Sequence, residues 1–151
     1  MGEVWRRGEF TVSTDNGRLD LELVHATLAA AYWAAEVPRA VVERSIERSL
    51  AFGLYHAQLQ IGFGRLITDR ATLAYFSDVF VAPEFRGRGL GHWLVSCMMA
   101  HPEVQGLRRW LLVTRDAHGF YREHGFVQLA DPTQWMEIAD LDIHRRGGER
   151  R

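Results

Sequence analysis

Three glycines within five residues mark the point where a β-rich stretch gives way to a helical one. Gly87, Gly89 and Gly91 follow the strand-like run "ATLAYFSDVFVAP", and from Leu90 onward the apolar residues recur at helical spacing. The next apolar run, "RRWLLVT", is typical of a buried strand. A strand, a tight turn, a helix and a strand make a βαβ unit, so this segment requires a sheet with a helix packed on it.

The remaining patterns extend this unit to a mixed α+β domain. "GEFTVST" predicts a first strand, and Asp20 and Pro38 each begin a helix. The stretch from Leu54 to Pro83 predicts a hairpin and a third strand in antiparallel order. A short helix capped by Gly125 and two last strands, "FVQLAD" and "QWMEIADL", follow. We therefore expect a mostly antiparallel sheet of about seven strands with about four helices.

No linker or repeat divides the chain, so residues 1–143 are predicted to form a single domain and residues 144–151 a polar, mobile tail. The net charge of −1 favours neither nucleic acid nor an anionic membrane as a partner. The longest apolar run, Leu28 to Ala35, is far shorter than the roughly 20 residues of a membrane span. We expect a cytoplasmic protein without a metal site, in which Cys97 is an inert, buried side chain.

Two explanations compete for the glycine turn. It is either a tight turn that needs positive φ angles, or an anion cradle in which a helix N-terminus offers free N–H groups. Arg86 and Arg88 favour the cradle, because neighbouring cations repel each other unless an anion or solvent compensates. The common nucleotide loops do not fit. His92 stands where a dinucleotide fingerprint needs glycine, and no Lys-Ser or Lys-Thr pair follows the last glycine.

The turn resembles a family signature. "RGRGLG", from Arg86 to Gly91, is similar to the Arg/Gln-x-x-Gly-x-Gly/Ala motif of the GNAT superfamily of acetyl-CoA-dependent N-acetyltransferases, and "AHGFYREHGF" is similar to that family's second motif. Thr114 replaces an asparagine that is usual there. The resemblance implies a coenzyme A site in which the turn holds the pyrophosphate and a strand backbone holds the pantetheine arm. The implied residues are Val79, Phe80, Val81, Arg86, Gly87, Arg88, Gly89, Leu90, Gly91 and His92.

The same resemblance implies direct transfer of acetyl from acetyl-CoA to a primary amine. Tyr121 aligns with the tyrosine that protonates the departing thiolate, although its apolar neighbours also suit an ordinary core aromatic. Asp78 is the candidate general base, with a solvated strand carboxylate as the alternative; His25, His56 and Glu36 are further candidates.

The acceptor site is expected on the first helices and the last strands. Aromatic and acidic side chains there suit an amine that is cationic before deprotonation, and those we select are Tyr32, Trp33, Glu36 and Trp135. The acceptor is a small-molecule amine or a peptide amine, so acetylation of protein N-termini or lysines stays an alternative. A non-catalytic acyl-CoA-binding domain is the rival hypothesis. Tryptophans outside the motifs leave room for a homodimer.

Overall fold

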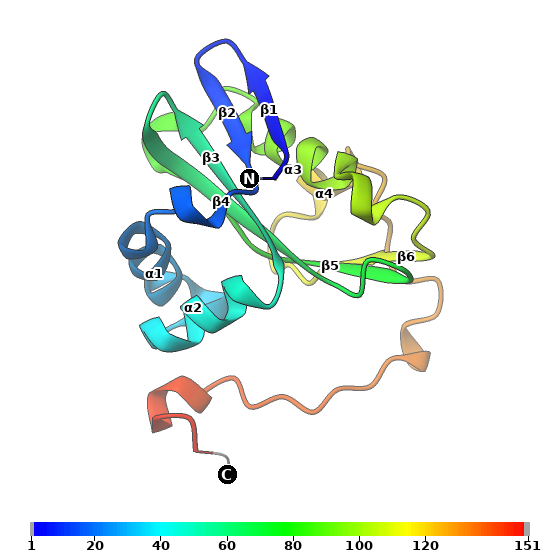
Figure 1. Cartoon of the computed structure of the whole chain (residues 1–151). Coiled ribbons are helices and arrows are strands. Elements are labelled where there is room, and N and C mark those ends of the chain that lie inside the picture. Colours follow the sequence, from blue (N-terminus) through cyan, green and yellow to red (C-terminus); the bar gives the residue numbers. More distant parts are fainter. Residues whose placement is uncertain (1, 150–151) are drawn as a thin grey trace.

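Six strands form one twisted sheet in which neighbours in space are also neighbours in sequence (Figure 1). The computed structural model describes residues 2–149. The strands are β1 (Val4–Arg7), β2 (Phe10–Ser13), β3 (Leu50–His56), β4 (Leu59–Thr68), β5 (Leu73–Val81) and β6 (Arg109–Leu111). The first five pair antiparallel and β6 joins β5 in parallel. The predicted α+β class is confirmed, with six strands in place of about seven.

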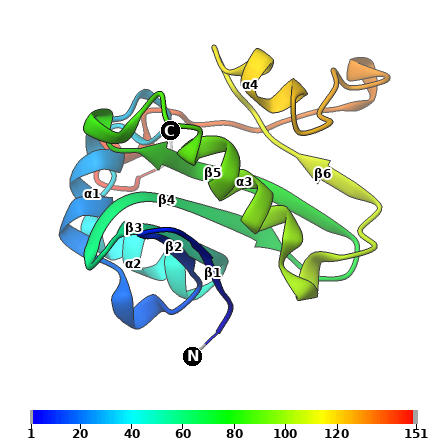
Figure 2. The same cartoon turned by 90° about the horizontal axis from the view of Figure 1, so that it is seen from above.

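Helices cover both faces of this sheet (Figures 1 and 2). They are α1 (Leu21–Ala30), α2 (Arg39–Glu47), α3 (Leu90–Ala100) and α4 (His118–Arg122). The predicted starts of the first two helices are confirmed: the Leu23 N–H donates to Asp20 Oδ1 at 3.0 Å, and Pro38 stands at the N-cap of α2. Gly125, at φ +95°, follows α4 as expected.

Each face of the sheet has its own core. On the α3 face, Leu94 and Met98 pack against strand residues such as Phe52 and Leu66. On the α1 and α2 face, Val24 and Val42 belong to a cluster with Phe63 and Phe80. Side chains of the strands point alternately to the two faces and so pack against both helical layers. The β5–α3 connection lies at the edge of the sheet where these two layers meet.

The structure differs from the prediction at both ends of the chain. The strand expected in "GEFTVST" is confirmed as β2, but an unpredicted strand, β1, precedes it, and a turn that includes Gly8 at φ +59° joins the two into a hairpin. The two last strands are not formed: within the described residues, 126–142 contain only the 3₁₀ turn η5 (Pro132–Gln134) and no strand. A strand forms only where its backbone groups pair with a neighbouring strand, and the described sheet, β1 to β6, does not include this segment.

The predicted tail begins inside a 3₁₀ turn, η6 (Ile143–Arg146). Arg145 Nε lies 2.8 Å from Glu36 Oε2, and the Arg146 guanidinium pairs with Asp140. Residues 150–151 of the predicted tail lie outside the described residues. Among the helices that the structure describes, none is both long and apolar enough to cross a membrane.

Candidate functional site

The glycine turn joins the end of β5 to the start of α3. After β5 comes the 3₁₀ turn η3 (Pro83–Phe85), and Gly87 and Gly89 then adopt φ values of +80° and +76°. A Cβ added to either glycine would meet no heavy atom within 4 Å. The turn therefore needs glycine for its backbone conformation, and it also leaves open space around that backbone. The positive φ angles fit the first explanation that the sequence left open, and the open space leaves room for the anion cradle of the second.

The N-terminus of α3 faces this open space without a side-chain cap. Gly89 is the N-cap residue, so no side chain accepts from the N–H groups of the first turn. The Trp93 N–H starts the helical ladder by donating to the Gly89 carbonyl at 3.0 Å. The N–H groups before it have no partner inside the helix and carry its partial positive charge. Such a terminus attracts an anion.

Both arginines of the turn are anchored beside it. Arg86 Nε donates to the Val81 carbonyl at 2.9 Å, and the Arg88 guanidinium carbon lies 5.2 Å from the centre of the Phe85 ring. Both side chains are exposed. Each arginine therefore still has guanidinium N–H groups that can donate to a ligand. The contact with Val81 or with Phe85 holds each side chain in position.

The His92 side chain faces α4. Its ring stacks on Phe120 at 4.3 Å, its Nδ1 lies 2.8 Å from His124 Nε2, and its Nε2 lies 3.2 Å from Glu123. Burial and the neighbouring His92 lower the pKa of His124. Gly91 makes room for this contact, since an added Cβ would stand 3.3 Å from the Phe120 ring. The His92 side chain thus fastens α3 to α4.

A β-bulge in the second half of β5 shifts which side chains face α3. Phe63 pairs with Phe80 and Arg65 pairs with Ser77, so Gly64 stands opposite both Asp78 and Val79. Asp78 has a φ of +59°. β6 pairs only with residues 73–75 of β5. Within the described chain, β5 beyond Tyr75 has a strand on one side only, and its outer edge is open for an extended ligand.

Asp78 lies on the α1 and α2 face, where both of its carboxylate oxygens accept hydrogen bonds. Trp33 Nε1 donates to Oδ1 at 3.0 Å and Arg65 Nε donates to Oδ2 at 2.6 Å. The side chains of Arg65 and Asp78 are only 14% and 8% exposed. A buried carboxylate of this kind needs its cation, so Arg65 and Asp78 form a unit. Arg65 was not predicted as a site residue; its signal in the sequence is a charged residue within an apolar strand.

Tyr32 and Trp33 both belong to the 3₁₀ turn η2 (Tyr32–Ala34), which follows α1 and contacts Asp78 and Arg115. The Tyr32 hydroxyl accepts from the Arg115 N–H at 3.2 Å, and the Arg115 guanidinium lies 3.7 Å from the Tyr32 ring centre. The Tyr32 and Trp33 rings meet edge to face, with their centres 5.2 Å apart. Arg115 was not predicted, because its contact with Tyr32 spans 83 positions of sequence.

Tyr121 packs among aromatic rings while its hydroxyl has no hydrogen-bond partner among the described residues. Phe120 lies 4.9 Å and Phe126 5.8 Å from its ring centre, both edge to face. Burial raises the pKa of Tyr121 to about 12, and the nearby Tyr32 acts in the same direction. Tyr121 therefore keeps its proton throughout the neutral range, as a proton donor requires.

Two predicted acceptor residues lie apart from this group. Glu36, at φ +63°, pairs with Arg145, and Trp135 has the Arg109 guanidinium 5.0 Å from its ring centre. No contact links either residue to Asp78 or Tyr121 within the described chain. The structure thus brings Tyr32, Trp33 and Asp78 together and leaves Glu36 and Trp135 at the margin.

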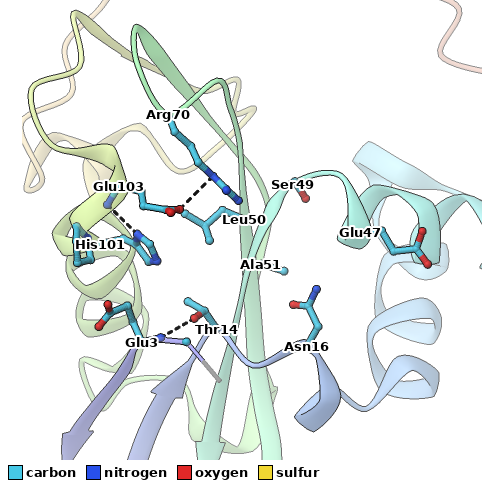
Figure 3. Close-up of a pocket in the computed structure, with 12 residues that line it drawn as sticks. Glu3, Thr14, Asn16, Glu47, Ser49, Leu50, Ala51, Arg70, His101 and Glu103 are labelled. Carbon is cyan, nitrogen blue, oxygen red and sulfur yellow. Dashed lines mark hydrogen bonds and ion pairs between the residues drawn. The ribbon is translucent and has the colours of Figure 1, made fainter.

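A cavity of about 380 Å³ lies beside His101, at the other end of α3 (Figure 3). Glu3 and Glu103 line it together with Arg70, which lies 3.3 Å from Glu103. His101 Nδ1 accepts from the Glu103 N–H at 3.1 Å, and burial lowers the pKa of His101. The lining contains none of the predicted site residues, so this cavity is separate from the glycine turn.

Comparison with known proteins identifies the family. Residues 47–128, which contain β5, the glycine turn, α3 and α4, match the family model of the acetyltransferase (GNAT) domain. The chain belongs to the GNAT family. A relative in Gibberella zeae, named as a presumed acetyltransferase, is 31% identical over 135 residues, which cover 74% of this chain and 75% of that protein. These matches support an acetyltransferase activity.

Solved structures agree with this GNAT assignment. A presumed acetyltransferase of the GNAT family from Xanthomonas campestris is 45% identical, with a TM-score of 0.88 over 92% of this chain and 99% of that one. The N-acetylglutamate synthase of Neisseria gonorrhoeae, complexed with coenzyme A and L-arginine, shares the fold at 17% identity. Its TM-score is 0.66, over 87% of this chain and 30% of that one. A fold neighbour of this GNAT chain thus binds coenzyme A.

Proposed function

We propose that this GNAT chain transfers an acetyl group from acetyl-CoA to a primary amine, with donor and acceptor bound together. The observation that carries the proposal is the uncapped N-terminus of α3, reached through Gly87 and Gly89, next to the open outer edge of β5. An anion seat and a strand edge side by side suit a ligand with a pyrophosphate and an extended, amide-bearing arm.

The residues fit coenzyme A in both places. The N–H groups at the start of α3 and the anchored Arg86 and Arg88 would hold the pyrophosphate, and the backbone from Val79 to Val81 would pair with the pantetheine arm. When bound, acetyl-CoA supplies the activated thioester. The His92 side chain faces α4, so we assign its contribution to its backbone N–H.

Tyr121 is our proposed general acid. Its pKa of about 12 keeps it protonated, and among the described residues nothing competes for its hydroxyl proton. A thiolate that leaves a tetrahedral intermediate takes up a proton, and Tyr121 would donate it. Its place in the α3-side core, among Phe76 and Phe120, holds the hydroxyl in a single position.

Asp78 is our proposed contact for the acceptor amine. Trp33 and Arg65 each take one lone pair of the carboxylate, and an ionised carboxylate accepts about four hydrogen bonds in all. Asp78 can therefore still accept from an ammonium group and receive its proton. Tyr32 and Trp33 add aromatic surface of the kind that attracts cations.

A free-thiol assay with acetyl-CoA and a panel of amines tests this function. The panel should include small amines, amino acids and peptides with free N-termini or lysines. Amine-dependent thiol release supports the proposal, and the preferred acceptor separates a small-molecule enzyme from a protein acetyltransferase. Tight coenzyme A binding without turnover on any amine would favour the non-catalytic acyl-CoA-binding domain instead.

A further inference from the structure

Arg115, just before α4, holds a guanidinium group beside the proposed acceptor site. Its guanidinium carbon lies 3.7 Å from the centre of the Tyr32 ring, and its backbone N–H donates to the Tyr32 hydroxyl at 3.2 Å. Arg115 is exposed, and within the described chain no carboxylate pairs with it. The residue therefore presents a positioned cation whose guanidinium N–H groups can donate to a ligand.

Tyr32 connects this cation to the groups that we propose act on the amine and the thioester. Its ring meets the Trp33 ring edge to face, and Trp33 Nε1 donates to Asp78 Oδ1 at 3.0 Å. Burial and, after it, the nearby Tyr32 raise the pKa of Tyr121, so Tyr32 also lies close to the proposed general acid. Both rings of η2 are nearly half exposed. A small acceptor that lies across these two rings has Asp78 at one end and Arg115 at the other.

The neighbouring charges leave Arg115 without a counterion. Asp78 is already paired with Arg65, at 2.6 Å and largely buried, so these two side chains together bring no net charge. Asp116, next to Arg115 in the sequence, is exposed and makes no ion pair with it in the described chain. A cation in this position attracts an anionic group on the acceptor and repels a second ammonium group, such as that of a polyamine.

We propose that the acceptor is a small primary amine that also carries a carboxylate or phosphate group, and that Arg115 binds this anionic group. The inference rests on the proposed acetyl transfer and adds the class of acceptor to it. A planar guanidinium can donate two parallel hydrogen bonds to either group, and its contact with the Tyr32 ring fixes its orientation.

The anionic group takes no part in the chemistry. The amine nitrogen bonds to the acetyl carbon as the carbon–sulfur bond breaks, the sulfur takes up one proton, and the second proton that the ammonium group loses leaves to solvent. The products are the N-acetyl compound, with its anionic group unchanged, and coenzyme A with a free thiol. Arg115 is therefore a specificity-determining residue and not a catalytic one.

Matched pairs of amines in the free-thiol assay test the acceptor class. The members of a pair share one amine and differ in the anionic group: β-alanine and γ-aminobutyrate are each compared with their carboxamide, and O-phosphoethanolamine with ethanolamine. We expect kcat/KM to be at least about tenfold higher for the anionic member, and this ratio should fall as salt rises. Both results need no variant, and the pair that shows the larger ratio distinguishes carboxylate from phosphate.

Two glutamine variants test the role of Arg115. Arg115→Gln removes the charge and keeps the backbone N–H that contacts Tyr32, and in this variant the preference for the anionic member should shrink at least about tenfold. Because each preference is a ratio over the same two amines, differences in amine basicity cancel between proteins. The matched control is Arg6→Gln, which removes an exposed arginine from β1, at the opposite edge of the sheet from β6, and should keep the wild-type preference.

The failure of this inference differs from the failure of the transfer reaction. Turnover of the neutral members that matches the anionic ones, or a preference that Arg115→Gln leaves intact, would overturn the acceptor class while acetyl transfer stands. An equal loss of preference in Arg6→Gln would attribute it to the overall charge of the chain and would also overturn the contact with Arg115. Thiol release with none of these amines would refute the proposed transfer and this inference with it.

Discussion

Replacing Gly89 with alanine separates the strain of the glycine turn from the space that the turn leaves for a ligand. At φ +76° an alanine pays the penalty of the left-handed region, about 1 to 2 kcal/mol, and its Cβ meets no atom of the protein. For a chain of this size the melting temperature should fall by about 2 to 8 °C. The loss of stability is therefore modest, and the variant should fold.

Coenzyme A affinity should fall more than the backbone strain alone explains. The new Cβ lies at the uncapped N-terminus of α3, where we place the pyrophosphate, so coenzyme A affinity should fall at least about tenfold, or about 1.4 kcal/mol. Gly106→Ala is the matched control. Gly106 has a φ of +73° and equally open surroundings, but it lies between the far end of α3 and β6.

Calorimetric titration with coenzyme A and thermal unfolding of both variants make the comparison. We expect similar losses of stability and a loss of affinity for Gly89→Ala alone. If both variants bind coenzyme A like the wild type, Gly89 serves only the backbone turn and the cradle reasoning fails.

Three further predictions concern single side chains. Tyr121→Phe should lower kcat at least about tenfold with little change in acetyl-CoA affinity, and an unchanged kcat would assign Tyr121 to the core. Because the pKa of Tyr121 is about 12, wild-type turnover should show no loss from tyrosine ionisation up to about pH 10. Arg86→Ala should weaken coenzyme A binding and flatten its salt dependence, and equal slopes for both proteins would exclude a charge contact. Cys97 should react with maleimide only after unfolding, because burial raises its pKa to about 11, and rapid labelling of the native protein, seen by mass spectrometry, would contradict its burial.

Local signals were sufficient to predict the segment that carries the proposed donor site. The β5 strand, the glycine turn and α3 follow one another in the chain, and Asp20 and Pro38 mark their helices through contacts within a few residues. The two last strands could not be predicted in the same way. Their composition suits a strand, but a strand also needs a neighbouring strand to pair with, and the described chain forms no strand within residues 127–142.

The acceptor side depends on contacts that the sequence does not show. Arg65 reaches Asp78 only because a bulge in β5 turns the carboxylate toward the α1 and α2 face. Trp33, which contacts Asp78, lies 45 positions from it in the sequence, and Tyr32 lies 83 positions from its partner Arg115. The residue types suggested an amine site at Tyr32 and Trp33 and a general base at Asp78. The contacts of Arg65 and Arg115 with these residues appear only in the fold.

Calorimetric titration of the unmodified chain with coenzyme A and acetyl-CoA tests the central claim most directly. If the glycine turn and the open edge of β5 form the donor site, each ligand should bind one molecule per chain in the micromolar range, and rising salt should weaken both. No detectable binding of either ligand at high micromolar concentration would contradict the assignment of the turn and, with it, the proposed transfer reaction.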